Sequence, residues 1–230
     1  MSPEPSSTVV DLSEILLALH ASSDSEQTVE RVAESARASV GCDDAGVLLV
    51  HARNRVETAT ATNAAVAEAH ELQVELDEGP CLDALEQPGA VYSITDAETD
   101  LQWPRWSKEV LRLGYRSVLS LPLATEERRY GSLNVYAARA DAFDDDDVAV
   151  ASILAQHASV ALASSRDVEG LRRAVDARKL IGMATGVLME RYDLDPDRSF
   201  EVLRRYSQHH NVKLREVARQ VVDHGTLPGA

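Results

Sequence analysis

The order of hydrophobic and polar positions divides the chain into a mixed first part and a purely helical last part. Up to residue 137, short apolar runs rich in β-branched residues are interleaved with segments of helical spacing. The predicted strands are residues 45–50, 55–62, 91–94, 117–123 and 130–137, and the predicted helices are residues 11–20, 26–40, 64–72, 81–85 and 106–113. Because hairpins join the strands, without regular βαβ units, the pattern predicts an α+β domain with an antiparallel sheet and flanking helices. The Pro- and Ser-rich residues 1–10 are expected to be disordered.

A long helix is predicted to begin at Asp144, where an acidic run suits the positive end of the helix dipole. Apolar residues recur seven apart at Leu154, Ala161, Val168 and Val175, and Val150, His157, Ser164 and Leu171 complete the other heptad positions. Such a stripe can cover a sheet and can also pair with its twin as a coiled coil. We therefore expect a homodimer through helix 144–175. Gly170 weakens the helix by about 1 kcal/mol relative to alanine, so a hinge is expected there.

The end of the chain predicts a bundle of three short amphipathic helices. Ala174, Ala177, Ile181, Ala184 and Leu188 recur at steps of three and four along the first helix. Asp195 and Pro196 suit the N-cap and first position of a second helix, which is expected to turn Phe200, Leu203 and Tyr206 inward and to be capped by Asn211. A third helix is predicted from Leu214 to Val222, ended by Gly225 and Pro228.

The charge of the chain is distributed unevenly between these two parts. The whole sequence holds 23 Lys+Arg and 38 Asp+Glu, a net charge of −15. Residues 166–230 hold 12 basic and 10 acidic residues, a difference of +2, which leaves 11 basic and 28 acidic residues, or −17, in residues 1–165. The first part would repel nucleic acid, so binding of a polyanion is expected only in the last part.

The last part resembles the ANTAR domain, the RNA-binding module of bacterial transcription antitermination regulators. The resemblance rests on three blocks of residues, which are Ile181-x-x-Ala184-x-Gly186-Val187-Leu188-Met189, Ser199-Phe200-x-x-Leu203-Arg204-x-x-Ser207 and Asn211-x-Lys213-Leu214-Arg215-x-Val217-Ala218. Many members of the family have lysine where this chain has Thr185, so one RNA-facing charge is missing. The resemblance implies an all-α three-helix domain, which we place at residues 166–226.

The first part resembles a GAF domain, a common bacterial sensory fold. The order of elements carries this resemblance, together with Gly79-Pro80-Cys81-Leu82-Asp83-Ala84 and Tyr130-Gly131-Ser132-Leu133-Asn134-Val135. We place the GAF-like domain at residues 11–165. The resemblance implies that this domain senses a signal, and a small-molecule ligand is expected to bind it.

The candidate RNA-binding residues are the basic residues of the bundle and one aromatic residue. They are Arg178, Lys179, Arg191, Tyr192, Arg204, Arg205, Lys213, Arg215 and Arg219. Arg215 and Arg219 share a helix face, and Tyr192 could stack on an unpaired base, whereas Tyr206 falls on the apolar side and is expected in the core. Without the resemblance, the same basic residues could form an ordinary solvated face interleaved with acidic residues.

The candidate ligand-sensing residues of the first part are Cys81, Tyr92, Trp103 and Trp106. Cys81 follows Gly-Pro at a helix start, where the dipole lowers the pKa of a thiol, although a buried structural thiol is the stronger expectation. The aromatic residues could line a pocket or could be ordinary packing, and the sequence leaves both open. No cysteine, histidine and carboxylate cluster has the spacing of metal ligands, so no metal or cofactor is expected.

Three functions are weighed against one another. The two resemblances imply a non-catalytic regulator in which a sensor controls binding of RNA stem-loops in nascent mRNA. The first alternative is a DNA-binding helix-turn-helix repressor that reads bases with residues 213–223. The second is a thiol-dependent enzyme in the first part, which the two cysteines in unlike contexts argue against. Those two cysteines form no disulfide framework, and we predict neither a signal peptide nor a membrane segment, so a cytoplasmic protein is expected.

Overall fold

The computed structural model describes Leu17, residues 24–87 and residues 89–227. The chain forms two compact units, residues 1–166 and residues 167–230. Three of our predictions lie outside the described residues: the disordered segment 1–10, most of helix 11–20 and the role of Pro228.

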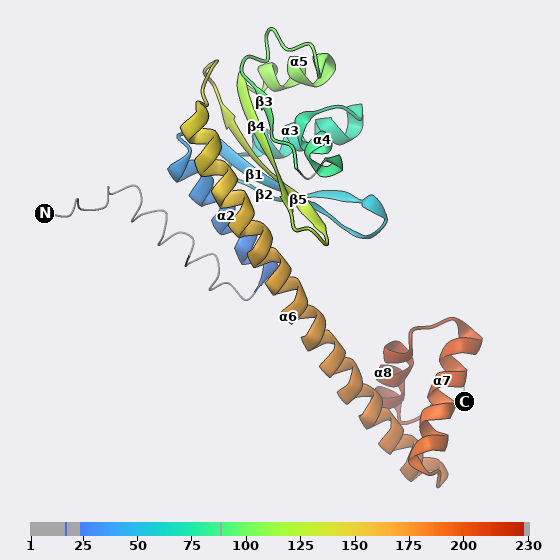
Figure 1. Cartoon of the computed structure of the whole chain (residues 1–230). Coiled ribbons are helices and arrows are strands. Elements are labelled where there is room, and N and C mark those ends of the chain that lie inside the picture. Colours follow the sequence, from blue (N-terminus) through green and yellow to red (C-terminus); the bar gives the residue numbers. More distant parts are fainter. Residues whose placement is uncertain (1–16, 18–23, 88, 228–230) are drawn as a thin grey trace, which may run out of the picture. The chain divides into compact units, whose positions relative to one another are not determined.

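The first unit is built on a five-stranded sheet in the order β2-β1-β5-β4-β3 (Figure 1). The strands are β1 Asp44–Val50, β2 Val56–Ala61, β3 Tyr92–Ile94, β4 Ser117–Ala124 and β5 Arg129–Ala137. Every neighbouring pair is antiparallel, which confirms the predicted sheet. The connection between β1 and β2 is the short helix η1, Ala52–Asn54, in which Arg53 and Asn54 have positive φ.

Helices cover both faces of this sheet and create two separate cores (Figure 1). On one face lie α2, Ser25–Ser39, and the beginning of α6, Asp145–Tyr192. On the other face lie α3, Ala64–Leu76, α4, Pro80–Glu86, and α5, Pro104–Arg112. Successive residues of a strand point to opposite faces, so Leu119 packs with α2 and α6 while Val118 packs with α3 and α5.

Helix α6 is one continuous helix of 48 residues that passes through Gly170 without a break. A Cβ built at Gly170 would meet no atom within 4 Å. The hinge expected there stays a prediction. Among the described helices, α6 alone is long and apolar enough to cross a membrane, but its buried residues Leu154, Ala158 and Leu162 belong to the core of the first unit. That placement is typical of the core helix of a soluble protein.

The two heptad series predicted along α6 do not form one exposed stripe. Leu154 and Ala161 are buried in the first unit, so they are not available to a second chain. The exposed large apolar residues of α6 are Ile153, Val160, Val168, Leu171, Val175 and Met183. The sheet covers one side of the helix. The sequence pattern alone could not distinguish a side that packs on the sheet from a side that packs on a second chain.

The second unit packs the end of α6 against α7, Pro196–His210, and α8, Leu214–His224. Its fully buried apolar residues are Ala184, Leu188, Leu203, Val217, Ala218 and Val221. Asp195 caps α7 as predicted by accepting a hydrogen bond from the backbone N–H of Arg198 at 2.8 Å. Asn211 and Gly225 end α7 and α8 with left-handed backbone conformations, also as predicted.

One core prediction for the bundle is wrong. Phe200 was expected to point inward, but 42 % of it is exposed, whereas Leu203 is fully buried. Residues three apart on a helix are offset by about 60°, so Phe200, Leu203 and Tyr206 fan over a wide arc. A bundle of short helices buries only the middle of that arc.

Candidate nucleic-acid interface

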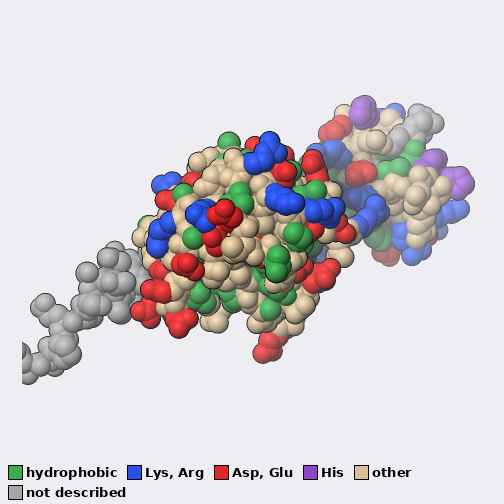
Figure 2. All heavy atoms as spheres, turned by 90° about the horizontal axis from the view of Figure 1, so that it is seen from above, with side chains coloured by type: hydrophobic (Ala, Val, Ile, Leu, Met, Phe, Trp, Pro, Cys, Tyr) green, Lys and Arg blue, Asp and Glu red, His purple; other side chains and the backbone are tan. Residues whose placement is uncertain are grey.

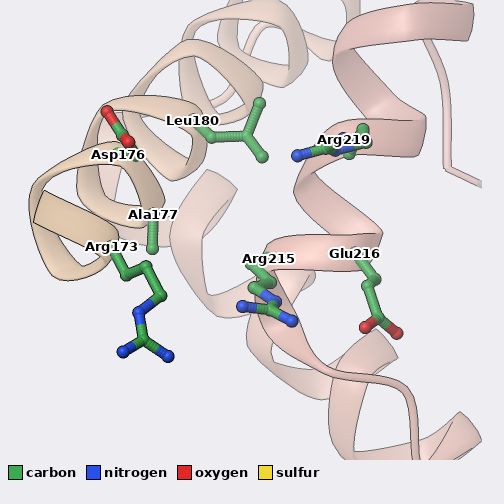
Figure 3. Close-up of a pocket in the computed structure, with 7 residues that line it drawn as sticks. All are labelled: Arg173, Asp176, Ala177, Leu180, Arg215, Glu216 and Arg219. Atoms are coloured by element: carbon green, nitrogen blue, oxygen red, sulfur yellow. The ribbon is translucent and has the colours of Figure 1, made fainter. Parts of the chain in front are cut away.

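A cleft in the second unit brings three arginines together (Figure 3). It has a volume of about 470 Å³ and lies between α6 and α8. Its lining residues are Arg173, Asp176, Ala177 and Leu180 of α6, and Arg215, Glu216 and Arg219 of α8. Arg173, Arg215 and Arg219 provide the cations, and Ala177 and Leu180 provide an apolar floor.

Regular helix geometry fixes the positions of these side chains. Arg215 and Arg219 are one turn apart on α8, and Val217, Ala218 and Val221 anchor the helix in the core. On α6, Arg173, Ala177 and Leu180 follow each other at steps of four and three, so they share a face. The cleft is therefore built on two packed helices and not on loops.

The charges in the cleft are only partly neutralised. Arg173 has the Glu169 carboxylate at 3.9 Å and also donates a hydrogen bond from Nε to the Glu169 carbonyl oxygen at 3.1 Å. Within the part of the chain that the structure describes, Arg215 and Arg219 have no carboxylate within ion-pair distance, although Glu216 also lines the cleft. Guanidinium groups with open donors suit the bidentate binding of phosphate.

The other predicted RNA-binding residues are spread over the unit. Arg178 and Lys179 line a different depression of about 610 Å³ on α6, together with Leu171 and Val175. Arg191 lies beside Gly225, and Tyr192 at the end of α6 is 44 % exposed. Figure 2 shows further Lys and Arg side chains (blue) over this unit, together with histidines (purple).

Helix α7 carries Arg204 and Arg205, and Lys213 occupies the N-cap position of α8. Arg204 makes an ion pair with Glu201 at 2.8 Å, which raises the pKa of the guanidinium and lowers the pKa of the Glu201 carboxyl. Arg204 is therefore already partnered, unlike Arg215 and Arg219. The structure adds Arg173 to the candidate site. Arg173 lies four residues before Ala177, so both share one face of α6, and this spacing is the sequence feature that could have identified Arg173.

Cys81 of the first unit is a fully buried thiol. Its Sγ accepts a hydrogen bond from Nε2 of Gln73 at 2.7 Å, and its backbone N–H donates to Oε1 of the same side chain at 2.8 Å. Burial raises the pKa of the thiol to about 11, so the lowering expected from the helix dipole is wrong. Helix α4 has only seven residues, and the loss of solvent around the sulfur outweighs its dipole.

The aromatic residues predicted near the ligand are part of a core. Trp106 is fully buried and donates its indole N–H to the Ala69 carbonyl oxygen at 2.9 Å. Trp103 is 4 % exposed, donates its indole N–H to Oδ2 of Asp83 at 3.2 Å and meets Tyr92 edge to face. Both tryptophans therefore pack in this core, and their part in ligand sensing stays a prediction.

Comparisons with solved structures agree with the fold of the first unit. The GAF domain of the cyanobacteriochrome TePixJ is 19 % identical with a TM-score of 0.53, covering 64 % of this chain and 94 % of that chain. The GAF domain of an Acinetobacter phosphoenolpyruvate-protein phosphotransferase is 15 % identical with a TM-score of 0.55, covering 72 % and 98 %. The Stigmatella aurantiaca phytochrome photosensory core module is 12 % identical with a TM-score of 0.62, covering 90 % and 46 %. At such identities the likeness shows the fold alone.

Family comparisons cover nearly the whole described chain. The family model of the GAF domain matches residues 22–163, and that of the ANTAR domain matches residues 169–222. No curated protein matches the chain. Both predicted resemblances are confirmed, as is the fold class of an α+β domain followed by a helical one. The chain therefore belongs to the GAF domain family and combines that sensory domain with an ANTAR domain, the module of RNA-binding antitermination regulation.

Proposed function

We propose that this protein is a cytoplasmic, non-catalytic antitermination regulator that binds stem-loops in nascent RNA. The GAF domain senses a signal and the ANTAR domain holds the RNA. A held stem-loop keeps its nucleotides out of the terminator hairpin, so the polymerase reads through. The two domains are sensory and regulatory in kind, which supports a role without catalysis.

The observation that carries this proposal is the cleft with three arginines. Arg173, Arg215 and Arg219 converge on it from two helices in a protein whose net charge is −15. Phosphates can bind the guanidinium groups while an unpaired base rests on the apolar floor of Ala177 and Leu180. Repulsion from the acidic first domain then confines RNA to the ANTAR domain.

The test is hairpin RNA binding measured over a range of salt concentrations. Each phosphate contact with a single strand contributes about 0.7 to the salt slope, so Arg215→Ala with Arg219→Ala should flatten it by about 1.4. Arg198→Ala is the matched control, because Arg198 lies outside the cleft and is ion-paired with Asp195 at 3.4 Å. An unchanged slope in the double variant would place the RNA elsewhere.

The same titrations distinguish RNA from duplex DNA as the partner. If the protein is a helix-turn-helix repressor, a duplex DNA competitor should displace the hairpin at comparable concentration. An RNA regulator should keep its hairpin under those conditions. Displacement by duplex DNA of unrelated sequence would contradict our proposal.

We further propose that the protein acts as a homodimer through α6. Ile153 and Val160 in the first unit are 38 % and 52 % exposed, and Leu171 and Val175 in the second are 69 % and 59 % exposed. Within the first unit Ile153 and Val160 are seven residues apart on α6, and within the second Leu171 and Val175 are one turn apart, the spacings that a coiled-coil seam uses. They replace the buried Leu154 and Ala161 of the predicted seam.

Light scattering tests the dimer directly. Val160→Glu with Leu171→Glu should give a monomer, because two carboxylates would be buried without partners in the seam. Leu101→Glu is the control, since Leu101 is 89 % exposed in a loop of the first unit and should leave the dimer intact. A wild-type monomer with full RNA binding would contradict the proposal.

A further inference from the structure

The start of β5, where the β4–β5 hairpin turns, contacts helices on both faces of the GAF sheet. Nη1 of Arg129 donates a hydrogen bond to the carbonyl oxygen of Leu85 in α4 at 2.7 Å. The next residue, Tyr130, is 5 % exposed and belongs to the core that α2 and α6 form on the opposite face. Two consecutive residues therefore connect the helix layers that lie on opposite sides of the sheet.

An irregularity in the sheet aims Tyr130 at α6. Asn134 and Tyr136 of β5 face α3 and α5 on the other side of the sheet. Residues two apart on a strand share a face, so regular alternation would place Tyr130 on that side as well. The register of β4 and β5 shifts between Leu123 and Ala124. Such a shift adds a residue to one strand and re-aims a side chain, which brings Tyr130 into the core with α2 and α6.

Tyr130 contacts α6 through a cation–π interaction. The guanidinium carbon of Arg166 lies 5.3 Å from the centroid of the Tyr130 ring, within the usual range of about 6 Å. The guanidinium carbon of Arg128, on the hairpin itself, lies 5.9 Å from the same centroid. If Arg166 leaves, the ring keeps a cation, which makes the release of Arg166 less costly. Such a contact has two arrangements, one with α6 held by the ring and one with α6 released.

Arg166 lies where α6 leaves the first unit. Leu162 and Ser165 are 0 % and 2 % exposed, so the helix is still packed on the GAF domain there. Across residues 166–183, all of which the structure describes, no residue of α6 is buried. The next buried residue is Ala184, which belongs to the core of the second unit. The contact between Tyr130 and Arg166 therefore involves the last turn of α6 that the GAF domain holds.

Helix α4, at the other end of this connection, depends on its neighbours for its position. It has seven residues, and Gly79 at its N-cap gives it no side-chain cap. A helix this short is not stable alone in water, so the surrounding contacts determine where it lies. Leu85 is in its last turn, where carbonyl groups have no partner within the helix. Arg129 binds one of these carbonyls, so a displacement of α4 acts directly on the residue beside Tyr130.

We propose that the start of β5 couples α4 to α6 and carries the signal of the sensory domain across the sheet. A displacement of α4 moves Arg129 and turns Tyr130. The turned ring keeps Arg128, which moves with the hairpin, and releases Arg166. The last turn of α6 in this unit, after Leu162, then loses its contact with the sheet, and the same helix continues into the ANTAR domain. This proposal rests on the sensory role in the proposed function and names the residues that transmit the signal.

The test is hydrogen exchange of the full chain, measured by mass spectrometry on peptides that cover residues 164–170. Arg166→Gln should speed exchange of these amides about twofold to fivefold, as expected for the loss of one cation–π contact. Tyr130→Leu keeps an apolar side chain in the core and should give the same increase. Faster exchange in Arg166→Gln but not in Tyr130→Leu would show that another group holds α6, and would overturn the proposal.

Arg129→Met tests whether the two contacts are coupled. It removes the hydrogen bond to Leu85 on the opposite face of the sheet, and should still speed exchange at residues 164–170 by about twofold or more. In the Arg166→Gln background it should add nothing, because the contact it acts through is already lost. Arg105→Met is the matched control, since this guanidinium binds the carbonyl oxygen of Leu76 at the end of α3 and should leave α6 unchanged.

Two results would refute the coupling. One is unchanged exchange at residues 164–170 in Arg129→Met, and the other is an equal added increase in the Arg166→Gln background, which would make the two contacts independent. Hairpin RNA binding by the wild-type chain is measured separately. Its absence would count against the proposed function, whereas the exchange rates decide the coupling alone.

Discussion

The bundle of the ANTAR domain should depend on Leu203 far more than on Phe200, although both lie on the apolar side of α7. Leu203 is fully buried, so Leu203→Ala should cost about 3–5 kcal/mol through lost burial and an unfilled cavity. Phe200 is 42 % exposed, and a wholly buried phenylalanine is worth about 1.5–3 kcal/mol. Its truncation opens no enclosed cavity, so Phe200→Ala should cost about 1 kcal/mol.

The expected consequence is selective unfolding of one domain. A unit of about 60 residues has a stability of about 3–10 kcal/mol, so Leu203→Ala removes a large share of it. The GAF domain has its own two cores and should be unaffected. RNA binding should be lost in Leu203→Ala and nearly retained in Phe200→Ala.

Two optical signals distinguish the domains in one melting experiment. Both tryptophans, Trp103 and Trp106, are buried in the first unit, so their fluorescence reports the GAF domain alone. Far-ultraviolet circular dichroism reports the helices of both units. Leu203→Ala should show an early loss of helix signal with no change in the fluorescence transition. Equal destabilisation by the two substitutions, or a fluorescence transition that moves with the helix signal, would refute this reasoning.

Three further predictions concern single groups. Cys42 and Cys81 are both buried, and burial raises the pKa of each thiol, so neither should react with a disulfide reagent until the protein is unfolded; rapid labelling of the native protein would contradict this. Burial lowers the pKa of His70 from 6.5 to about 3, so the neutral ring contributes its full stabilisation above pH 6.5. As the pH falls below 6.5, the free energy of unfolding measured in denaturant titrations should fall by roughly 1 kcal/mol per pH unit. His70→Gln should remove this dependence. Gly131→Ala should destabilise the sheet by about 3 kcal/mol or more, because its Cβ would lie 1.8 Å from the Leu48 carbonyl oxygen. In contrast, Gly170→Ala should stabilise α6 by about 0.5–1 kcal/mol. A read-through reporter would show whether this stiffening of α6 alters antitermination.

The local pattern of the sequence was sufficient for most of the secondary structure and for both families. Alternating and helical periodicities report which residues share a face, and caps such as Asp195 and Gly225 mark helix ends through backbone chemistry that needs no distant partner. The spacing of the three residue blocks in the last part sufficed for the ANTAR resemblance because it describes one small bundle whose contacts are close in sequence.

Only the tertiary structure decided which of these faces is covered and which distant residues meet. Periodicity made Leu154 a candidate for a dimer seam and Phe200 a core residue, but the sheet covers the former and a short bundle leaves the latter exposed. Arg173 joins Arg215 and Arg219 because α8 folds back against α6, and His70 reaches Asn134 from an element 64 residues away. Such contacts depend on how whole elements pack, which a periodicity within one element does not specify.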